Sequence, residues 1–229
     1  MALVVNDTFT EAGADTRLDL HTGETGATWA ICASDSSGGT LFYPTVDAGV
    51  DELRGGNTVN NQFWYASGSP ANANQKVTAT LNRRGSSTGQ WTGIMLRTDT
   101  GASLTAYVLF YINAATPYFR LYKIIAGAGT QLGSDYTYTL PSTTDTDVDF
   151  YAVGSSIRAY LGSTLMISAT DSSITSAGKF GLRFSDYALT GAGSGVNFSR
   201  YQGWDSATLP NNAGASRRPF SAMRGVYTR

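Results

Sequence analysis

The chain is poor in charged residues and in cysteine. Charged side chains make up 14% of its 229 residues, and the formal net charge is −1. So small a charge argues against a nucleic-acid binder that works through bulk electrostatics, and against a disordered acidic protein. The single cysteine, Cys32, excludes an intrachain disulfide and a cysteine-based metal centre. We expect no nucleic-acid partner, and synthesis in a reducing cytosol.

Long apolar runs are also missing. The longest candidate, residues 108–112, has the length of a strand and falls well short of the ~18 residues that a membrane span needs. The first residues include no basic stretch, and their apolar segment is too short for a signal peptide. We therefore expect no membrane association and no export.

Glycine and aromatic residues are abundant instead. The chain has 26 glycines, 13 tyrosines and 10 phenylalanines, and short alternating segments are separated by Gly, Ser, Asn and Pro. This pattern predicts an all-β fold with two antiparallel sheets over residues 1–205. Alternation assigns these residues to the core between the sheets: Ile94, Leu96, Phe119, Leu121, Val148, Phe150, Ile157, Ala159, Leu161, Leu165, Ile167, Phe180, Leu182 and Phe184.

The faces opposite this core carry an unusual share of tyrosine and arginine. A simple solvent face would hold more lysine, glutamate and threonine, whereas tyrosine and arginine are typical of recognition surfaces. Two interpretations stay open: tyrosines that pack in cross-strand pairs on a curved outer sheet, or a face that binds a ligand or partner. For the second, the candidate ligand-binding residues are Arg97, Tyr107, Tyr111, Arg120, Tyr122 and Tyr160.

Patterns for catalysis and for metal binding are scarce. His21 is the only histidine, so it cannot form a zinc site with Cys32. No Gly-x-Ser-x-Gly nucleophile elbow is present, and we expect His21 to hydrogen-bond its loop shut beside Trp29.

Three aspartates alternate at the start of one predicted strand. A solvated strand start accounts for them, and calcium binding through their carboxylate oxygens is the weaker alternative. The candidate calcium ligands are Asp145, Asp147 and Asp149. We expect no other cofactor.

Several segments, in their order and spacing, resemble the concanavalin A-like jelly roll in its laminin-G-like form. The matching segments are residues 7–10, 21–29, 93–97, 119–123, 154–184 and 196–198, so the resemblance covers residues 5–204. The second segment resembles a His-Thr-Pro-x-x-Gly-like loop followed by a tryptophan, with Gly23 where a proline is usual. Domains of this kind are common in phage virion proteins and in secreted bacterial sugar-binding proteins.

The resemblance implies a jelly-roll sandwich but says little about activity. Members of this fold that cleave β-glucans carry a Glu-x-Asp-x-x-Glu pattern on one strand, and this chain lacks it. Retaining hydrolysis needs two carboxyl groups ~5 Å apart, which such a strand supplies. We therefore expect a protein that is not an enzyme.

Residues 206–229 differ in composition from the rest of the chain. They carry four arginines and no acid, a balance of +4, whereas residues 1–205 carry 12 basic and 17 acidic residues, a balance of −5. We predict an extended arm that attaches to a partner, with packing against its own domain as the alternative. The candidate partner-binding residues are Arg217, Arg218, Phe220, Met223, Arg224 and Tyr227.

Together these features favour a structural protein of a bacteriophage virion, a capsid decoration or head-fibre protein that displays a lectin-like domain. A carbohydrate-binding tail or adhesion module that recognises host glycans comes second, and a glycan hydrolase comes third. The expected partners are other virion proteins (major capsid or tail proteins), surface glycans and further copies of the chain in a homo-oligomer. The expected location is the virion, assembled in the host cytoplasm.

Overall fold

Two antiparallel β-sheets pack face to face in the computed structural model, which describes residues 1–32, 43–55, 62–85, 88–101, 103–142, 144–185 and 195–210. The nine-stranded sheet contains, from edge to edge, β14 (Thr164–Thr170), β13 (Ser156–Leu161), β12 (Thr146–Val153), β7 (Gln75–Arg84), β16 (Gly195–Asp205), β5 (Glu52–Arg54), β4 (Thr45–Asp47) and β2 (Thr16–Arg17), while β1 (Ala2–Asp7) also pairs with β16.

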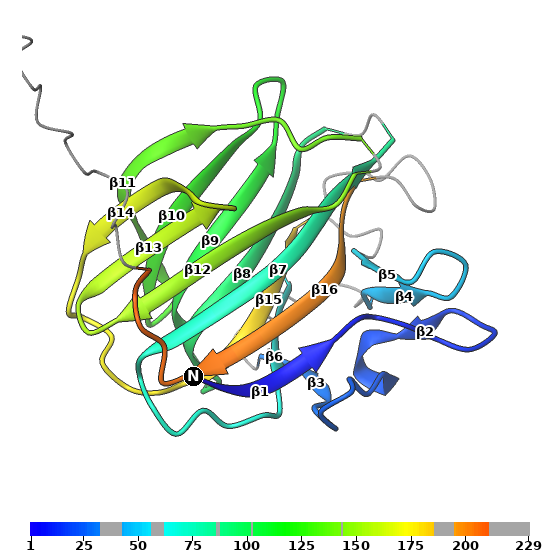
Figure 1. Cartoon of the computed structure of the whole chain (residues 1–229), viewed down its shortest axis with the longest axis horizontal. Helices are drawn as coiled ribbons and strands as arrows, with labels where there is room; N and C mark the ends of the chain where they lie inside the picture. The colour runs from blue at the N-terminus through cyan, green and yellow to red at the C-terminus, as the bar shows by residue number, and fades with distance from the viewer. Residues whose placement is uncertain are drawn as a thin grey trace, which may run out of the picture.

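The seven-stranded sheet forms the second layer. It contains, in order, β11 (Ala128–Thr137), β10 (Tyr118–Ile125), β9 (Thr105–Asn113), β8 (Gln90–Asp99), β15 (Lys179–Ser185), β6 (Gln62–Ala66) and β3 (Trp29–Ile31). Figure 1 shows β12, β7 and β16 in front of β8, β9 and β10. The described residues contain one 3₁₀ turn, η1 (Leu18–Leu20), and none of their helices is long and apolar enough to span a membrane. The predicted all-β sandwich is confirmed.

Apolar residues from the facing sides of both sheets form the main core. The alternation of the sequence predicted this core well, because all of the residues it assigned there are buried in one cluster except Leu161 and Leu165. Leu161 is half-buried and packs against the cluster. Interdigitated side chains of two stacked sheets are the usual interior of a β-sandwich.

Leu165 is the residue that the sequence placed on the wrong face. Its side chain is 41% exposed, whereas Ile167 is buried in the core. A β-bulge lies in β14 at Met166, so that Ala159 of β13 pairs with Ile167 while the next residue, Tyr160, pairs with Leu165. The bulge shifts the register by one residue, and such a shift moves a side chain to the opposite face.

Tight turns with left-handed residues join neighbouring strands. Between β10 and β11, Ala126 and Gly127 both have positive φ (49° and 82°), which is the geometry of a two-residue type I′ hairpin. Between β13 and β14, Gly162 has a φ of 56°, a left-handed conformation that glycine adopts readily in a hairpin turn.

The N-terminal loop is closed by the buried side chain of His21. Its Nε2 lies 2.8 Å from Asp7 Oδ1, and its Nδ1 lies 2.6 Å from Glu11 Oε1. Trp29 donates its indole N–H to the other oxygen of Asp7 at 2.7 Å. The prediction that His21 holds its loop beside Trp29 is confirmed, and Asp7 is the side chain that links the two rings. A Cβ at Gly23 would lie 2.6 Å from the Asn6 carbonyl oxygen, so the close approach of this loop to β1 requires glycine.

Candidate functional site

The outer face of the seven-stranded sheet gathers aromatic side chains. Strand β9 is apolar on both sides: Tyr107 and Tyr111 point into the core, while Val108, Phe110 and Ile112 point outward. Side chains alternate along a strand, so the outward positions of the neighbouring strands follow from the cross-strand pairs. We call this surface the aromatic face; its half-buried rings are Phe63, Tyr65, Trp91, Tyr118 and Tyr122.

Three rings of the aromatic face form a line across three adjacent strands. Trp91 of β8 and Phe110 of β9 have ring centroids 5.9 Å apart, at an interplanar angle of 66°. Phe110 and Tyr122 of β10 are 5.6 Å apart at 79°. Edge-to-face packing of this kind is favourable, and it fixes the orientation of each ring. These three rings therefore support one another and form one continuous surface.

Arg183 of β15 lies among these rings. Its guanidinium carbon is 4.4 Å from the centroid of Phe110, 5.4 Å from Phe63 and 5.6 Å from Trp91. Gly93 lies between Arg183 and Phe110 in the sheet, paired with both. Since glycine has no side chain, the arginine can extend across β8 to the phenylalanine ring. Stacking of a guanidinium on aromatic rings stabilises both, and most strongly where water is excluded.

Polar side chains adjoin the rings at the β10–β11 edge. Arg120 binds Asp135 with two hydrogen bonds, Nε to Oδ1 at 2.7 Å and Nη2 to Oδ2 at 2.6 Å, and Gln131 donates to Asp135 at 3.1 Å. The hydrogen bonds from Arg120 hold the pKa of Asp135 below its ordinary value, and those from Asp135 raise the pKa of Arg120. Both side chains are therefore charged at neutral pH and form a neutral pair.

This arrangement suits the recognition of a ligand that has both an apolar face and hydroxyl groups. Aromatic rings cover apolar ring faces, while fixed donors and acceptors set the orientation. The outward positions of β8 and β9 beside the rings carry no carboxylate; they are Trp91, Gly93, Met95, Val108, Phe110 and Ile112. The pair of acids that retaining glycoside hydrolysis requires is therefore not formed by these strands.

Two of the predicted ligand-binding residues, Arg120 and Tyr122, lie on the aromatic face. Tyr107 and Tyr111 do not, and their predicted exposure is wrong. Their hydroxyls are satisfied inside the protein: Tyr107 donates to Asp171 Oδ1 at 2.7 Å, and Tyr111 accepts the Leu140 N–H at 3.0 Å. Burial raises the pKa of Tyr107 to about 12.

Arg97 is also buried, contrary to the prediction, with 1% of its side chain exposed. A register shift of β8 at this point, with a φ of +52° at Arg97, turns the side chain toward one end of the sandwich. There the guanidinium donates to the carbonyl groups of Ala73, Ile174 and Gly154 at 2.8, 2.5 and 2.8 Å. Arg97 therefore ties three loops together, and it is not available as a surface contact.

Tyr160 lies on the other side of the molecule, on the outer face of the nine-stranded sheet. It packs edge-to-face against Tyr151 with ring centroids 5.6 Å apart, and Ala207 and Leu209 cover the pair. The Ala207 N–H donates to the Asn74 carbonyl at 2.7 Å. The start of the segment that was predicted to be an arm thus lies against the sandwich, as the red-orange chain after β16 in Figure 1 shows.

The three aspartates proposed as calcium ligands bind protein cations and donors instead. Asp147 accepts from Arg200 at 3.0 Å, and Asp149 contacts Lys76 Nζ at 2.9 Å. Asp145 accepts from Asn82 and Ser199 at 3.1 and 3.0 Å. Asp145 and Asp147 line the same surface hollow as Arg200, and the described residues contain no cluster of three metal-binding side chains. Calcium binding by these residues stays a prediction.

The predicted partner-binding residues lie outside the described residues, so their role stays a prediction; they are Arg217, Arg218, Phe220, Met223, Arg224 and Tyr227.

Sequence reasoning missed several residues of the aromatic face. Phe63 and Tyr65 alternate with the core residue Trp64, and Trp91 alternates with Thr92, so alternation alone would have placed them on the side opposite the core. What alternation could not show is that these strands are neighbours in one sheet, because that pairing is set by the tertiary fold.

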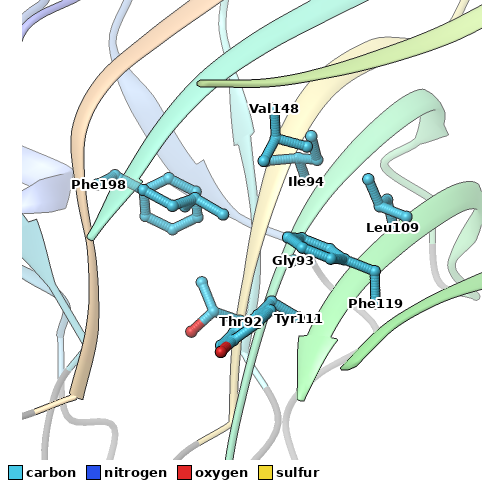
Figure 2. A pocket seen from close by; sticks show the side chains of 9 residues that line it. Thr92, Gly93, Ile94, Leu109, Tyr111, Phe119, Val148 and Phe198 are labelled. Carbon is cyan, nitrogen blue, oxygen red and sulfur yellow. The ribbon is translucent and has the colours of Figure 1, made fainter. Parts of the chain in front are cut away.

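A gap also lies between the two sheets. Its walls come from both sheets and include Thr92, Gly93, Ile94, Leu109, Tyr111, Phe119, Val148 and Phe198, which Figure 2 shows pointing toward a common centre. The open space is about 10 Å³, the size limit for a single water molecule. This gap is a packing defect of the core and not a ligand site.

No protein-family model and no curated protein sequence matches the chain. Several solved structures are similar to it over most of its length. The carbohydrate-binding module CBM66 from Bacillus subtilis is 19% identical, with a TM-score of 0.51, over 82% of this chain and 94% of that one. The Bacillus licheniformis beta-glucanase is 13% identical, with a TM-score of 0.53, over 84% and 98%. The Ca²⁺/Man2-bound exoplasmic/lumenal domain of VIP36 is 7% identical, with a TM-score of 0.57, over 86% and 88%.

The fold is the concanavalin A-like jelly roll. At these sequence identities the likeness establishes the fold and leaves the activity to the site itself. No residue of the aromatic face is assigned from these similar structures.

Proposed function

We propose that this protein binds glycans through the aromatic face of its seven-stranded sheet. The observation that carries this proposal is the line of Trp91, Phe110 and Tyr122, with Arg183 held among the rings. A sugar ring has apolar C–H faces and an equatorial belt of hydroxyls, and a surface of fixed rings flanked by polar groups matches both. The carbohydrate-binding module and the Man2-bound domain among the similar structures support this reading.

We further propose binding without hydrolysis. The strands beside the rings offer hydrophobic and aromatic side chains, and the carboxylate identified on this face, Asp135, is neutralised by Arg120. A general acid requires a raised pKa, whereas the pKa of Asp135 is lowered by its hydrogen bonds to Arg120. Release of reducing sugar from polysaccharides, with loss of that release in Asp135→Asn, would contradict this proposal.

A structural role on a bacteriophage particle stays a prediction from the sequence resemblance. Such a role is compatible with glycan binding, since a virion protein can display a lectin-like domain. The virion partners, the homo-oligomer and the location on the particle are likewise predictions from the sequence.

The test of glycan binding is a glycan array followed by titration calorimetry of the best ligand. We expect dissociation constants in the millimolar to micromolar range, roughly −4 to −8 kcal/mol. Trp91→Ala removes one platform from the line of rings, so it should weaken binding at least about tenfold, which corresponds to ~1.4 kcal/mol.

Trp204→Ala is the matched control, because Trp204 is a half-buried tryptophan of β16 in the other sheet. It should leave glycan affinity unchanged. Equal losses in both variants would indicate a global effect on folding, and full affinity in Trp91→Ala would remove the aromatic face from consideration.

A further inference from the structure

The β10–β11 edge of the aromatic face holds a polar cluster between two rings. Tyr118, Arg120 and Tyr122 occupy alternate positions of β10 and therefore share its outer side. Across the edge, Gln131 pairs directly with Tyr122, and Asp135 reaches Arg120. We call Arg120, Asp135 and Gln131 the polar edge cluster.

The cluster is held in one geometry before any ligand arrives. The guanidinium carbon of Arg120 lies 4.9 Å from the centroid of the Tyr118 ring while its Nε and Nη2 bind both oxygens of Asp135. Gln131 donates to the same carboxylate and to the Gly133 carbonyl, at 3.1 and 3.2 Å. Preorganisation lowers the entropic cost of binding, because these side chains need not be ordered again.

The cluster retains unused hydrogen-bonding capacity. Arg120 carries five N–H donors, of which its two bonds to Asp135 use two, and the Asp135 carboxylate offers about four lone-pair sites, of which Arg120 and Gln131 use three. The side chains of Arg120 and Asp135 are 22% and 34% exposed, so these remaining donors and acceptors are open to solvent. A pair of neighbouring sugar hydroxyls can donate to Asp135 and accept from Arg120 together, with the sugar ring against Tyr118 or Tyr122.

We infer that the polar edge cluster is a sugar subsite that selects neutral sugars over uronic acids. This inference rests on the proposed glycan binding and adds its substrate class. The charge of Arg120 is balanced by Asp135, so the cluster offers no net attraction to an anionic sugar, and the carboxylate of a uronic acid would approach Asp135 with like charge. Hydroxyl groups suffer no such repulsion.

The test compares a linear galactose oligomer with the galacturonic acid oligomer of the same linkage and length. The two probes differ in the carboxylate alone. Wild-type protein should bind the galactose oligomer at least about tenfold more tightly. Asp135→Asn leaves Arg120 without its counter-charge, so it should weaken binding of the neutral oligomer and strengthen binding of the acidic one, and the selectivity should fall or invert.

The chain offers a closely matched control. Arg17 binds Asp19 through Nε and Nη2 at 2.9 and 2.6 Å, and it stacks over the Tyr43 ring at 3.5 Å. Arg17 belongs to β2 of the nine-stranded sheet and is not part of the aromatic face. Asp19→Asn therefore removes an equivalent carboxylate from an equivalent Arg–Tyr stack. It should change neither affinity nor selectivity.

Each outcome separates this inference from the proposed function. Loss of binding in Trp91→Ala with unchanged selectivity in Asp135→Asn would leave the glycan-binding function standing and overturn the subsite. Wild-type preference for the acidic oligomer would overturn the inferred substrate class. Absence of glycan binding by the wild-type protein would overturn both.

Discussion

At the scale of single residues, a buried imidazole stabilises the N-terminal loop through its charge. His21 is 4% exposed and lies between the carboxylates of Asp7 and Glu11. Burial lowers the pKa of His21, but the hydrogen bonds to Asp7 and Glu11 outweigh this effect and raise it to about 9. A positive imidazolium between two carboxylates is well compensated, and removing such a group leaves uncompensated buried charge.

The raised pKa predicts that stability decreases at alkaline pH. The folded-state pKa lies above the unfolded value of 6.5, so the stabilisation is fully present below about pH 6.5 and is lost as pH rises through about 9. Its upper limit is about 3 kcal/mol in the free energy of unfolding. Chemical denaturation across this pH range should show that decrease.

His21→Gln is the control for the alkaline transition. Glutamine keeps a hydrogen-bond donor but does not titrate, and His21 is the only histidine of the chain. The variant should be less stable than wild type at pH 6.5, with a nearly flat profile toward pH 9. A wild-type profile that is equally flat would show that His21 is not charged in the folded state.

The burial of two tyrosines could not be predicted from the sequence. Tyr107 and Tyr111 were expected on an outer face, but they lie on the core face of β9 together with Leu109. A tyrosine can be buried when its hydroxyl has a partner, and here the partners come from residues far along the chain, Asp171 and Leu140. No local pattern in the sequence reveals such a partner.

At the scale of elements, β-bulges decide which residues reach the core. The bulge at Met166 of β14 turns Leu165 outward while Ile167 remains buried, although both were expected inside. Sheet pairing follows from the hydrophobic pattern, and the extra residue of a bulge interrupts that pattern without a clear mark in the sequence. The strands and most inward positions were thus predictable, whereas the position of Leu165, next to the bulge in β14, was not.

The bulge makes the two apolar residues of β14 unequal. Ile167→Ala should lower the free energy of unfolding by about 2–4 kcal/mol, because it leaves a cavity in the core. Leu165→Ala, a truncation of the same size two residues away, should cost no more than about 0.5–1 kcal/mol. Urea denaturation of both variants measures this contrast, and similar losses would contradict the assigned register.

At the scale of the whole molecule, the two sheets carry different surfaces. The seven-stranded sheet presents the aromatic face. The nine-stranded sheet presents ion pairs such as Lys76 with Asp149, together with the tyrosine pair covered by Ala207 and Leu209. The sandwich was predictable from the sequence because period-2 alternation recurs throughout it, but which outer face would carry the rings depended on strand order.

The covered tyrosine pair predicts where the folded unit ends. Deleting residues 211–229 should leave the melting temperature nearly unchanged. Deleting residues 207–229 uncovers Tyr151 and Tyr160 and removes the Ala207–Asn74 hydrogen bond, so it should lower the free energy of unfolding by about 1–2 kcal/mol. Thermal and urea denaturation of both truncations measure the difference.

The two truncations also bear on the predicted arm. An arm that attaches the protein to a particle should be required for incorporation but not for folding, so the shorter deletion should abolish incorporation alone. A large fall in melting temperature on removing residues 211–229 would favour the alternative, in which that segment packs on its own domain.

The position of Leu209 against Tyr151 and Tyr160 also sets the orientation of the molecule on any support. The described chain ends at Pro210 on the outer side of the nine-stranded sheet, whereas Trp91 and Tyr122 lie on the outer side of the seven-stranded sheet. A bead, a sensor chip or a fusion partner joined directly after Pro210 would therefore meet the back of the sandwich. The rings would face the solution, so the protein could be immobilised through this end without blocking its proposed sugar-binding surface.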